Sequence, residues 1–208
     1  WGSMKSSIWG DLLERWFAII GHRAPSEGSL NLNDLPGSGG RMDVLVRAVN
    51  AALFVSHGVR DDSHVILHLM GGGGPNRRIW FDGTRLGGVR PDERSIAGQI
   101  KGINKHPIPP RDRFKEFSSG ILHSGGNIIQ TLQEWEERGV GPVLLDAEGG
   151  DFNSIRNSNN LGFILSDDQP LSDLDKVDLN SLDSLSLGRE WLQGHSCISV
   201  IHHLLDEF

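Results

Sequence analysis

Apolar residues along this chain gather in short runs separated by polar and glycine-rich segments. Several runs have the apolar, partly β-branched and aromatic composition that is typical of β-strands. They cover Arg15–His22, His64–Met70, Arg78–Asp82, Pro142–Leu145, Leu161–Leu165 and Ser184–Leu187. Because Pro142–Leu145 and Leu161–Leu165 are continuously apolar, we expect both to be central strands buried on both faces. The second and third runs flank the glycines at 71–74 and are expected to form a hairpin.

Helical spacing of apolar residues appears in four other segments. They run from about Gly40 to Ser56, from Glu93 to Ile103, from Asn127 to Arg138, and through the C-terminal stretch to Phe208. Asp92 stands where an N-cap of the second helix would lie, and Gly58 and Gly139 stand where left-handed caps would end the first and third. In the last helix the spacing places Cys197, Ile201, Leu204 and Phe208 on one face.

Between the second and third of these helices lies the proline-rich stretch Lys105–Pro110. A residue before proline is restricted to extended conformations, so this stretch should be an extended linker. We interpret the residues after it as an insertion loop that leads into the helix at Asn127.

Strands and helices alternate along the rest of the chain, a pattern that favours an α/β fold with a mostly parallel sheet. Ligands of such sheets bind beyond the carboxyl ends of the strands. The segments that should frame a site are therefore Leu145–Gly149, Ser166–Gln169 and the turn around Gly188.

The length of 208 residues suits one such domain. Gly2–Met4 resembles the remnant of an expression tag, so we divide the chain into an N-terminal extension, residues 1–14, and a single domain, residues 15–208. Apolar runs stay well short of the roughly 18 residues that span a membrane, and no signal-peptide pattern is present. We therefore expect a soluble, cytoplasmic protein without membrane contact.

The formal net charge of −7 is unevenly distributed. Residues 1–104 hold 12 Lys or Arg against 10 Asp or Glu, and residues 105–208 hold 8 against 17. Any basic surface for a nucleic acid should therefore be built by the N-terminal half, with ordinary scatter of surface charge as the alternative. The one cysteine excludes an internal disulfide, and His57, His64 and His68 lack the spacing of a zinc site, so no metal is expected.

The glycine-rich segment Pro36–Gly40 precedes the first helix. Its glycines allow close approach of a ligand to the backbone, and the free amides at a helix start attract anions. No Gly-Lys-Ser/Thr follows, so the segment is not a P-loop. Arg41, Asp43 and Arg47 lie off the apolar face of the helix, where Asp43 and Arg47 can pair. A binding edge and a simple salt-bridged helix start both fit these residues. The same choice, phosphate contact or a solvated face, applies to Arg90, Arg94 and Lys101 along the second helix.

Three blocks of the sequence resemble one known family. They are S-L-G-x-x-x-L-x-x-H-S-C-I-x-V-x-H-x-x-L-D at Ser186–Asp206, N-L-N-D-L-P-G-S-G-G-R-M-D-V-L-V-R at Asn31–Arg47, and P-D-E-R-S-I at Pro91–Ile96. In this order they resemble the archaeal tRNA pseudouridine(54) N1-methyltransferases, the TrmY family of the SPOUT superfamily. The resemblance runs from about Arg15 to Asp206 and is weakest between Asn104 and Gly139.

The resemblance implies a SPOUT-type sheet flanked by helices, a deep C-terminal trefoil knot and a homodimer. It also implies that S-adenosyl-L-methionine binds in the three loops at the sheet edge. Carried over position by position, the cofactor-binding residues are Leu145, Ser166, Leu185, Ser186, Leu187, Gly188, Arg189, Glu190 and Cys197. The chain departs from the family at Asp168, usually histidine, at Arg189, usually proline, and at 119–122, where an aromatic segment is missing.

The implied reaction methylates N1 of pseudouridine 54 in the T-loop of tRNA. We assign the catalytic roles to Asp43 and Arg41. Asp43 would accept the N1 proton, because the resemblance places its helix beside the cofactor. Arg41 and Arg47 would hold the phosphate or uracil carbonyls of an extruded nucleotide. The expected RNA-binding residues are Arg47, Arg60, Arg90 and Arg94.

Two other functions remain open from the sequence. One is methylation of pseudouridine N1 in ribosomal RNA. The other is a non-catalytic homologue that binds the cofactor or RNA, a reading prompted by Asp168, Arg189 and the missing aromatic segment.

Overall fold

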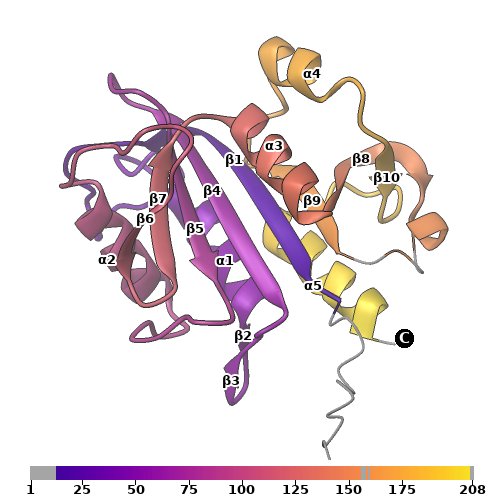
Figure 1. Cartoon of the computed structure of the whole chain (residues 1–208), viewed down its shortest axis with the longest axis horizontal. Helices are drawn as coiled ribbons and strands as arrows, with labels where there is room; N and C mark the ends of the chain where they lie inside the picture. Colours follow the sequence, from indigo (N-terminus) through magenta and orange to yellow (C-terminus); the bar gives the residue numbers. More distant parts are fainter. Residues whose placement is uncertain (1–12, 156–157, 159, 207–208) are drawn as a thin grey trace, which may run out of the picture.

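The computed structural model describes residues 13–155, 158 and 160–206. It is a mixed α/β fold built on an eight-stranded sheet with the order β10-β8-β9-β1-β4-β5-β7-β6 (Figure 1). Most of the proposed N-terminal extension and Phe208 lie outside the described residues. Within them, no helix is long and apolar enough to cross a membrane.

The strands on one side of the sheet are parallel. β1 (Arg15–Pro25) pairs with β4 (Ser63–Gly71) and, on its other edge, with β9 (Leu161–Ser166). β8 (Gly141–Asp151) pairs with β9, and β10 (Ser184–Ser186) pairs with β8. The carboxyl ends of these strands therefore meet at one edge of the sheet, as the sequence predicts. β9 is buried along most of its length, but β8 is only partly buried, because Leu144 and Leu145 face an open cavity, so the expectation of burial on both faces was wrong for β8.

The other side of the sheet is antiparallel. β5 (Arg77–Asp82) forms the predicted hairpin with β4 and then pairs with β7 (Ile121–Gly125), which pairs with β6 (Lys115–Ser118). The prediction of an insertion loop was wrong for residues 115–125. β6 carries Lys, Glu and Ser, which have weak strand propensity, and its pairing comes from the neighbouring strand rather than from a local pattern.

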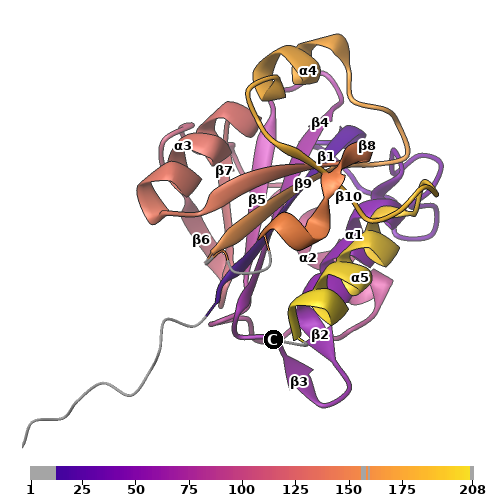
Figure 2. The same cartoon turned by 90° about the vertical axis from the view of Figure 1, so that its right-hand side faces the viewer.

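Helices cover both faces of the sheet (Figure 2). On one side lie α1 (Met42–Leu53), α2 (Glu93–Ile103) and α5 (Gly194–Asp206), and on the other α3 (Ile128–Arg138) and α4 (Asp173–Leu179). A hydrophobic core lies on each face of the sheet. Successive side chains of β1 pack alternately into one core and the other, because strand residues alternate between faces. Phe17 and Ile19 join the first core, and Trp16 and Ile20 join the second.

Two of the predicted helix caps formed as expected. The Asp92 side chain accepts a hydrogen bond from the Ser95 amide, and Gly139 ends α3 in the left-handed conformation. Gly58 does not cap α1. The helix stops at Leu53, and the chain enters a small hairpin of β2 (Phe54–Val55) and β3 (Gly58–Val59). The aromatic and β-branched residues at 54 and 55 favour the extended conformation that replaces the predicted last turn.

The inward face of α5 differs from the predicted one. Ile198, Ile201 and Leu205 are buried, whereas Cys197 and Leu204 are only partly buried. The helix is rotated about its axis relative to the predicted orientation, because His202 also faces the core. Its ring nitrogens lie 3.0 Å from Arg15 Nη1 and 3.0 Å from the carbonyl oxygen of Ala52. The spacing of apolar residues cannot predict a buried polar side chain that is held by hydrogen bonds.

The predicted linker is held by a buried cation. Arg77, fully buried, donates to the carbonyl oxygens of Ser26 at 2.6 Å, Ile103 at 3.1 Å and His106 at 2.7 Å. Its Nη1 also donates to Nδ1 of His123 at 2.7 Å. Burial and the Arg77 charge lower the pKa of His123 to about 4, so its ring is a neutral acceptor. One side chain thus ties β5 to the start of the linker.

Replacing Arg77 with methionine should lower the free energy of unfolding by about 2–3 kcal/mol, because several buried carbonyl groups lose their donor. Urea denaturation would measure the change. Arg113→Met, at an exposed position between the linker and β6, is the matched control and should stay within about 0.5 kcal/mol of the parent. Equal stabilities of the two variants would contradict the role given to Arg77.

Candidate active site

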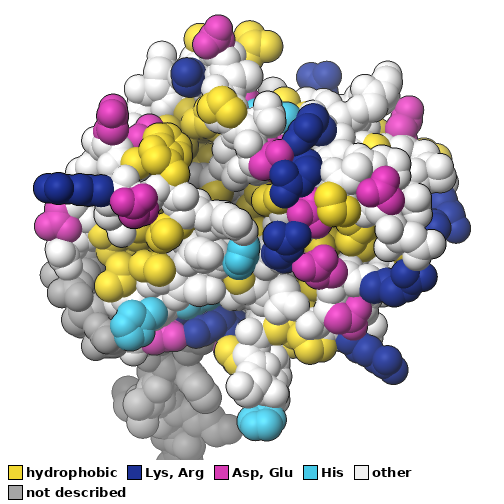
Figure 3. All heavy atoms as spheres, turned by 180° about the vertical axis from the view of Figure 1, so that it is seen from behind, with side chains coloured by type: hydrophobic (Ala, Val, Ile, Leu, Met, Phe, Trp, Pro, Cys, Tyr) yellow, Lys and Arg dark blue, Asp and Glu magenta, His cyan; other side chains and the backbone are white. Residues whose placement is uncertain are grey.

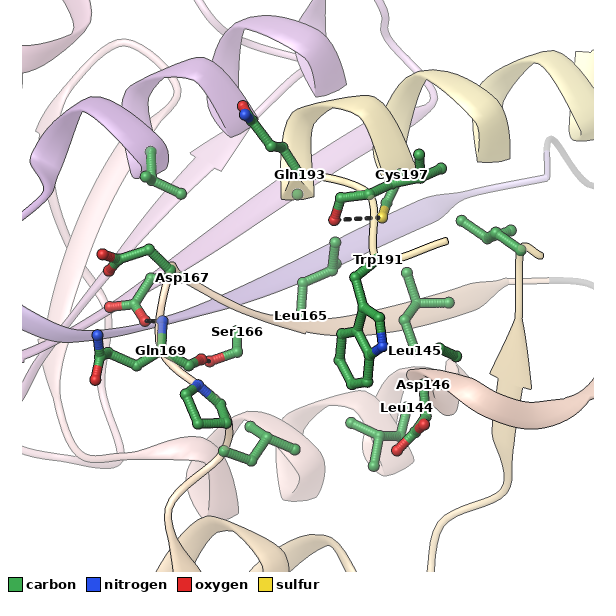
Figure 4. A pocket seen from close by; sticks show the side chains of 18 of the residues that line it. Leu144, Leu145, Asp146, Leu165, Ser166, Asp167, Gln169, Trp191, Gln193 and Cys197 are labelled. Atoms are coloured by element: carbon green, nitrogen blue, oxygen red, sulfur yellow. Dashed lines mark hydrogen bonds between the residues drawn. The ribbon is translucent and has the colours of Figure 1, made fainter. Parts of the chain in front are cut away.

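A cavity of about 780 Å³ opens at the carboxyl ends of the parallel strands. Its walls come from β8, from the segments after β9 and β10, from the first turn of α5, and from the start of α1 (Figure 4). Residues 145–149, which the sequence placed after the strand, lie inside β8, where the pairing with β10 shifts register. All three segments that the sequence analysis expected to frame a site therefore meet there. The size lies within the range of pockets that hold drug-sized ligands and cofactors.

Most of the predicted cofactor residues line this cavity. Leu145 comes from the first segment, Ser166 from the second, and Cys197 from α5. The third segment contributes Leu185, Leu187, Gly188 and Glu190. Ser186 and Arg189 are not part of the wall. Ser186 instead braces the turn, because its Oγ lies 3.0 Å from the carbonyl oxygen of Ala147 and accepts a hydrogen bond from the Gly188 amide at 3.1 Å.

A glycine allows the first and third segments to touch. A Cβ atom added at Gly149 would lie 2.6–2.7 Å from backbone atoms of Leu185, closer than real Cβ contacts come. Gly188 has φ 133°, a value that side chains with a Cβ rarely adopt. The cavity wall on this side is thus a backbone surface that requires glycine at both positions.

The opposite wall, at the start of α1, is charged. Arg41 has a left-handed backbone conformation, with φ 64°, and forms a two-pronged bond to Asp43, at 2.9 Å from Nε and 3.1 Å from Nη2. Its Nη1 donates to Asp168 at 2.7 Å. Arg47 donates to Asp43 at 2.6 Å and to Glu93 at 3.0 Å. Arg41 and Arg47 both line the cavity, with the fork of Arg41 held between two carboxylates.

Similarity to known proteins identifies the family of this chain. A family model described as "Putative SAM-dependent RNA methyltransferase" matches residues 14–208. The chain belongs to this family. The tRNA (pseudouridine(54)-N(1))-methyltransferase of Methanospirillum hungatei JF-1 is 36% identical to this chain over 191 residues, 91% of this chain and 95% of that protein. The enzyme of the same name from Methanosarcina mazei is 36% identical over 196 residues, 92% of this chain and 90% of its own.

A solved structure shares the fold of this RNA methyltransferase family member. The crystal structure of Archaeoglobus fulgidus Nep1 bound to S-adenosylhomocysteine matches with a TM-score of 0.64. It covers 94% of this chain and 98% of that one, at 13% sequence identity. At this identity the likeness concerns the fold.

The cavity of this family member suits the cofactor that the family uses. Leu145, Leu185 and Leu187 offer an apolar surface to an aromatic ring system. Carboxylates of Asp146, Glu148 and Glu190 offer negative charge to the sulfonium and ammonium groups of S-adenosylmethionine. In the part of the chain that the structure describes, no group of three or more His, Cys, Asp or Glu side chains is arranged to hold a metal ion.

Asp43 lies in a different place from the one predicted for the proton acceptor. Its carboxyl is 2% exposed, both oxygens are bonded to arginines, and it does not line the cavity. Burial raises the pKa of Asp43, but Arg41 and then Arg47 outweigh that effect and hold this pKa below its usual value. A carboxylate so placed is a weak base without access to the ligand. The structure favours a role in positioning Arg41.

The remaining predicted RNA-binding residues lie outside the cavity wall. Arg60 is bonded through both terminal nitrogens to Asp206, at the far end of α5. From Cys197, which lines the cavity, the rise of that helix puts Asp206 about 13 Å away. Arg90 and Arg94 are exposed near the start of α2, and Arg94 donates to Asn33 at 3.0 Å. Figure 3 shows Lys and Arg side chains interspersed with Asp and Glu rather than a uniformly basic surface.

Two residues of the site were missed by sequence reasoning. Trp191 is 80% exposed and points its ring toward the cavity, near Leu145 (Figure 4). Its position directly after the third segment is the signal in the sequence that points to it. Asp167 lines the cavity with a carboxyl that is fully buried against His22. No sequence pattern joins these two residues, which are 145 positions apart.

Replacing Asp43 with asparagine should lower kcat/KM for RNA methylation about 10- to 100-fold, because Arg41 loses one of the two carboxylates that orient its guanidinium. The shape of the pH–rate profile should not change, because we expect a buried carboxylate paired with two arginines not to accept the proton. Radiolabelled methyl transfer at several pH values would measure both. Glu93→Gln, which changes an exposed carboxylate bonded to Arg47, is the control and should cost less than about threefold. Undiminished methylation by Asp43→Asn would remove Asp43 from both roles.

Proposed function

We propose that this protein transfers the methyl group of S-adenosylmethionine to N1 of pseudouridine 54 in the T-loop of tRNA. The observation that carries the proposal is the joining of three backbone segments and an arginine edge around one cavity. The substrate follows from relatives of that name, which are 33–36% identical over about nine-tenths of the chain.

In this proposal one wall of the cavity binds the cofactor and the opposite wall binds the target base. The leucines and the backbone around Gly188 would hold the cofactor, which supplies an activated methyl group. The arginine edge would hold the target base, extruded from the T-loop, with N1 facing that methyl. Alignment of two reactants in this way contributes several kcal/mol to catalysis.

Arg41 can also make N1 a better nucleophile. Loss of the N1 proton leaves negative charge on the uracil ring and its carbonyl oxygens. A guanidinium fixed beside them stabilises this charge without reorganising during the reaction. Asp43 and Asp168 keep the fork of Arg41 in one orientation. In this mechanism the proton leaves to solvent, and no carboxylate of the α1 edge receives it.

Mass spectrometry of T-loop fragments tests the proposal. Purified protein would be incubated with S-adenosylmethionine and with tRNA that carries either uridine or pseudouridine at position 54. A gain of one methyl group only in the pseudouridine substrate supports it. Methylation of a ribosomal RNA hairpin and not of tRNA would favour the first alternative. Cofactor binding without methylation of either RNA would favour the non-catalytic homologue.

The finer features of the family are part of the same proposal. We propose the SPOUT-type trefoil knot, because the chain runs from β9 out to β10 at the sheet edge and then back to α5, which packs on α1. The RNA contacts of Arg47, Arg60, Arg90 and Arg94 remain predictions, as do the cytoplasmic location and the boundary of the single domain near residue 15.

A homodimer is also proposed. Trp191 and Leu192, which precede α5, are exposed apolar side chains that a second copy would cover. Light scattering on the purified protein would give the mass of a dimer. A monomer at concentrations that support full activity would contradict this part of the proposal.

A further inference from the structure

His22 lies between two carboxylates at the end of β1. Its Nδ1 is 3.1 Å from Asp167 Oδ1, and its Nε2 is 2.9 Å from Asp175 Oδ2. The backbone amide of His22 donates to the other oxygen of Asp167 at 2.8 Å. Both carboxyl groups are at least 95% buried. Only the doubly protonated ring has an N–H for each of these acceptors.

The two carboxylates stand at the two ends of one segment beside the cavity, and Asp167 lines the cavity whereas Asp175 does not. Asp167 follows β9, and its Oδ1 also accepts the Gln169 amide at 2.8 Å, which shapes the segment 166–169. Asp175 lies in the first turn of α4 and accepts hydrogen bonds from the backbone and hydroxyl of Ser172 at 2.8 Å and 2.6 Å. The His22 ring therefore holds both ends of the chain between β9 and α4. Pro170 and Leu171, which line the cavity, lie between those ends.

We propose that protonated His22 is a positioning residue that holds segment 166–171 in the shape that binds the methyl donor, so that loss of this proton weakens cofactor binding. The inference rests on the proposed function, because it takes the cavity to be the cofactor site. The neutral ring would turn a lone pair toward one buried carboxylate and lose both ionic contacts. The segment would then be held at one end only.

The charges around the ring favour this protonated state. Partial burial lowers the pKa of His22, but hydrogen bonds to Asp175 and Asp167 and the charges of both outweigh it, so the pKa stands above its usual value. Asp168, the next acidic residue, is bonded to Arg23 and Arg41. His68 approaches Asp175 from β4, but burial and the charge of Arg78 lower its pKa to about 3, which leaves it neutral. Asp173, Lys176 and Asp178 are the other charged groups of α4.

The sign of the pH effect follows from the raised pKa. The contribution of the His22 contacts is complete below the pKa of an unperturbed histidine, about 6.5. It is lost as the pH rises through the higher pKa of the folded protein. The dissociation constant of S-adenosylhomocysteine, measured by calorimetry, should therefore rise about tenfold between about pH 6.5 and about pH 9.

Variants identify the titrating group. His22→Gln should bind S-adenosylhomocysteine about tenfold more weakly at the lower pH and show no further change. His57→Gln, in the exposed β2–β3 turn, is the matched control and should keep the parent profile. Asp175→Asn should weaken binding and flatten the profile without altering the cavity wall. His195 lines the cavity, so loss of the pH dependence in His195→Gln, with its retention in His22→Gln, would overturn the inference.

A second measurement does not need the cofactor. Nitrogen-15 spectra of the free protein near pH 6.5 should show two protonated ring nitrogens on His22, and the Gln169 amide should shift as the ring titrates. A neutral ring at that pH would overturn the inference even if the cofactor binds. Absence of cofactor binding at every pH would instead defeat the proposed function, and the ring spectra would still decide the state of His22.

Discussion

Replacing Arg41 with alanine should lower kcat/KM for tRNA methylation by about 100- to 1,000-fold, the loss seen when one fixed donor to a developing charge is removed. The dissociation constant of S-adenosylhomocysteine should change by less than about threefold, because the leucine wall holds the cofactor. The fold should survive, since Asp43 keeps Arg47 as a partner and Asp168 keeps Arg23. Alanine also occupies the left-handed conformation at residue 41 with no greater strain than arginine.

Two further variants make this result specific. Arg41→Lys keeps the charge without the planar fork and should recover only part of the activity. Arg85→Ala removes an exposed arginine that pairs with Asp82 and Glu116 and does not line the cavity, so its activity should match the parent. Equal losses in Arg41→Ala and Arg85→Ala would show that overall positive charge matters and the position of Arg41 does not.

Replacing Gly149 with alanine should weaken S-adenosylhomocysteine binding by roughly 10- to 100-fold. The added methyl group would meet the backbone of Leu185, which cannot turn aside as a side chain can. Overpacking of this kind costs about 1–3 kcal/mol, and here relief requires β10 and the Leu185–Gly188 turn to move away from the cavity. Calorimetric titration with S-adenosylhomocysteine would measure the loss.

The neighbouring glycine is a close control. A Cβ at Gly150 would lie 3.6 Å from the carbonyl oxygen of Ser184, an ordinary contact. Gly150→Ala should therefore bind S-adenosylhomocysteine within about twofold of the parent. If both variants bind equally well, the tight approach of the first and third segments is not needed for the cofactor site.

Much of the fold was readable because its signals are local. The caps of α2 and α3 depend on residues within a few positions of the helix ends, and both were predicted from those residues. The buried strand β9 is marked by its own continuous apolar run. Segments that pair through distant partners were harder. β6 has no apolar alternation of its own and becomes a strand only because β7 offers an edge to it.

The site also has features that the sequence predicts and features that it does not. The meeting of residues 145–149 of β8 with the segments after β9 and β10 follows from parallel strands, which bring their carboxyl ends to one edge. The charged residues of α1 could be named from the sequence, but not the direction of each side chain. Asp43 turned inward because Arg41, held in a left-handed conformation, and Arg47 close over it from both sides.

The order of apolar runs, caps and glycines in this chain was enough to specify an α/β sheet and its site-bearing edge, and the resemblance of three sequence blocks to a known family named the individual cofactor residues. The sheet and its edge depend on backbone conformation and periodicity, which neighbouring residues set. The rotation of α5 around His202, the burial of Asp43 and the pairing of His22 with Asp167 and Asp175 needed the folded molecule. Each depends on polar contacts between residues far apart in the chain, whose geometry exists only after the elements have packed.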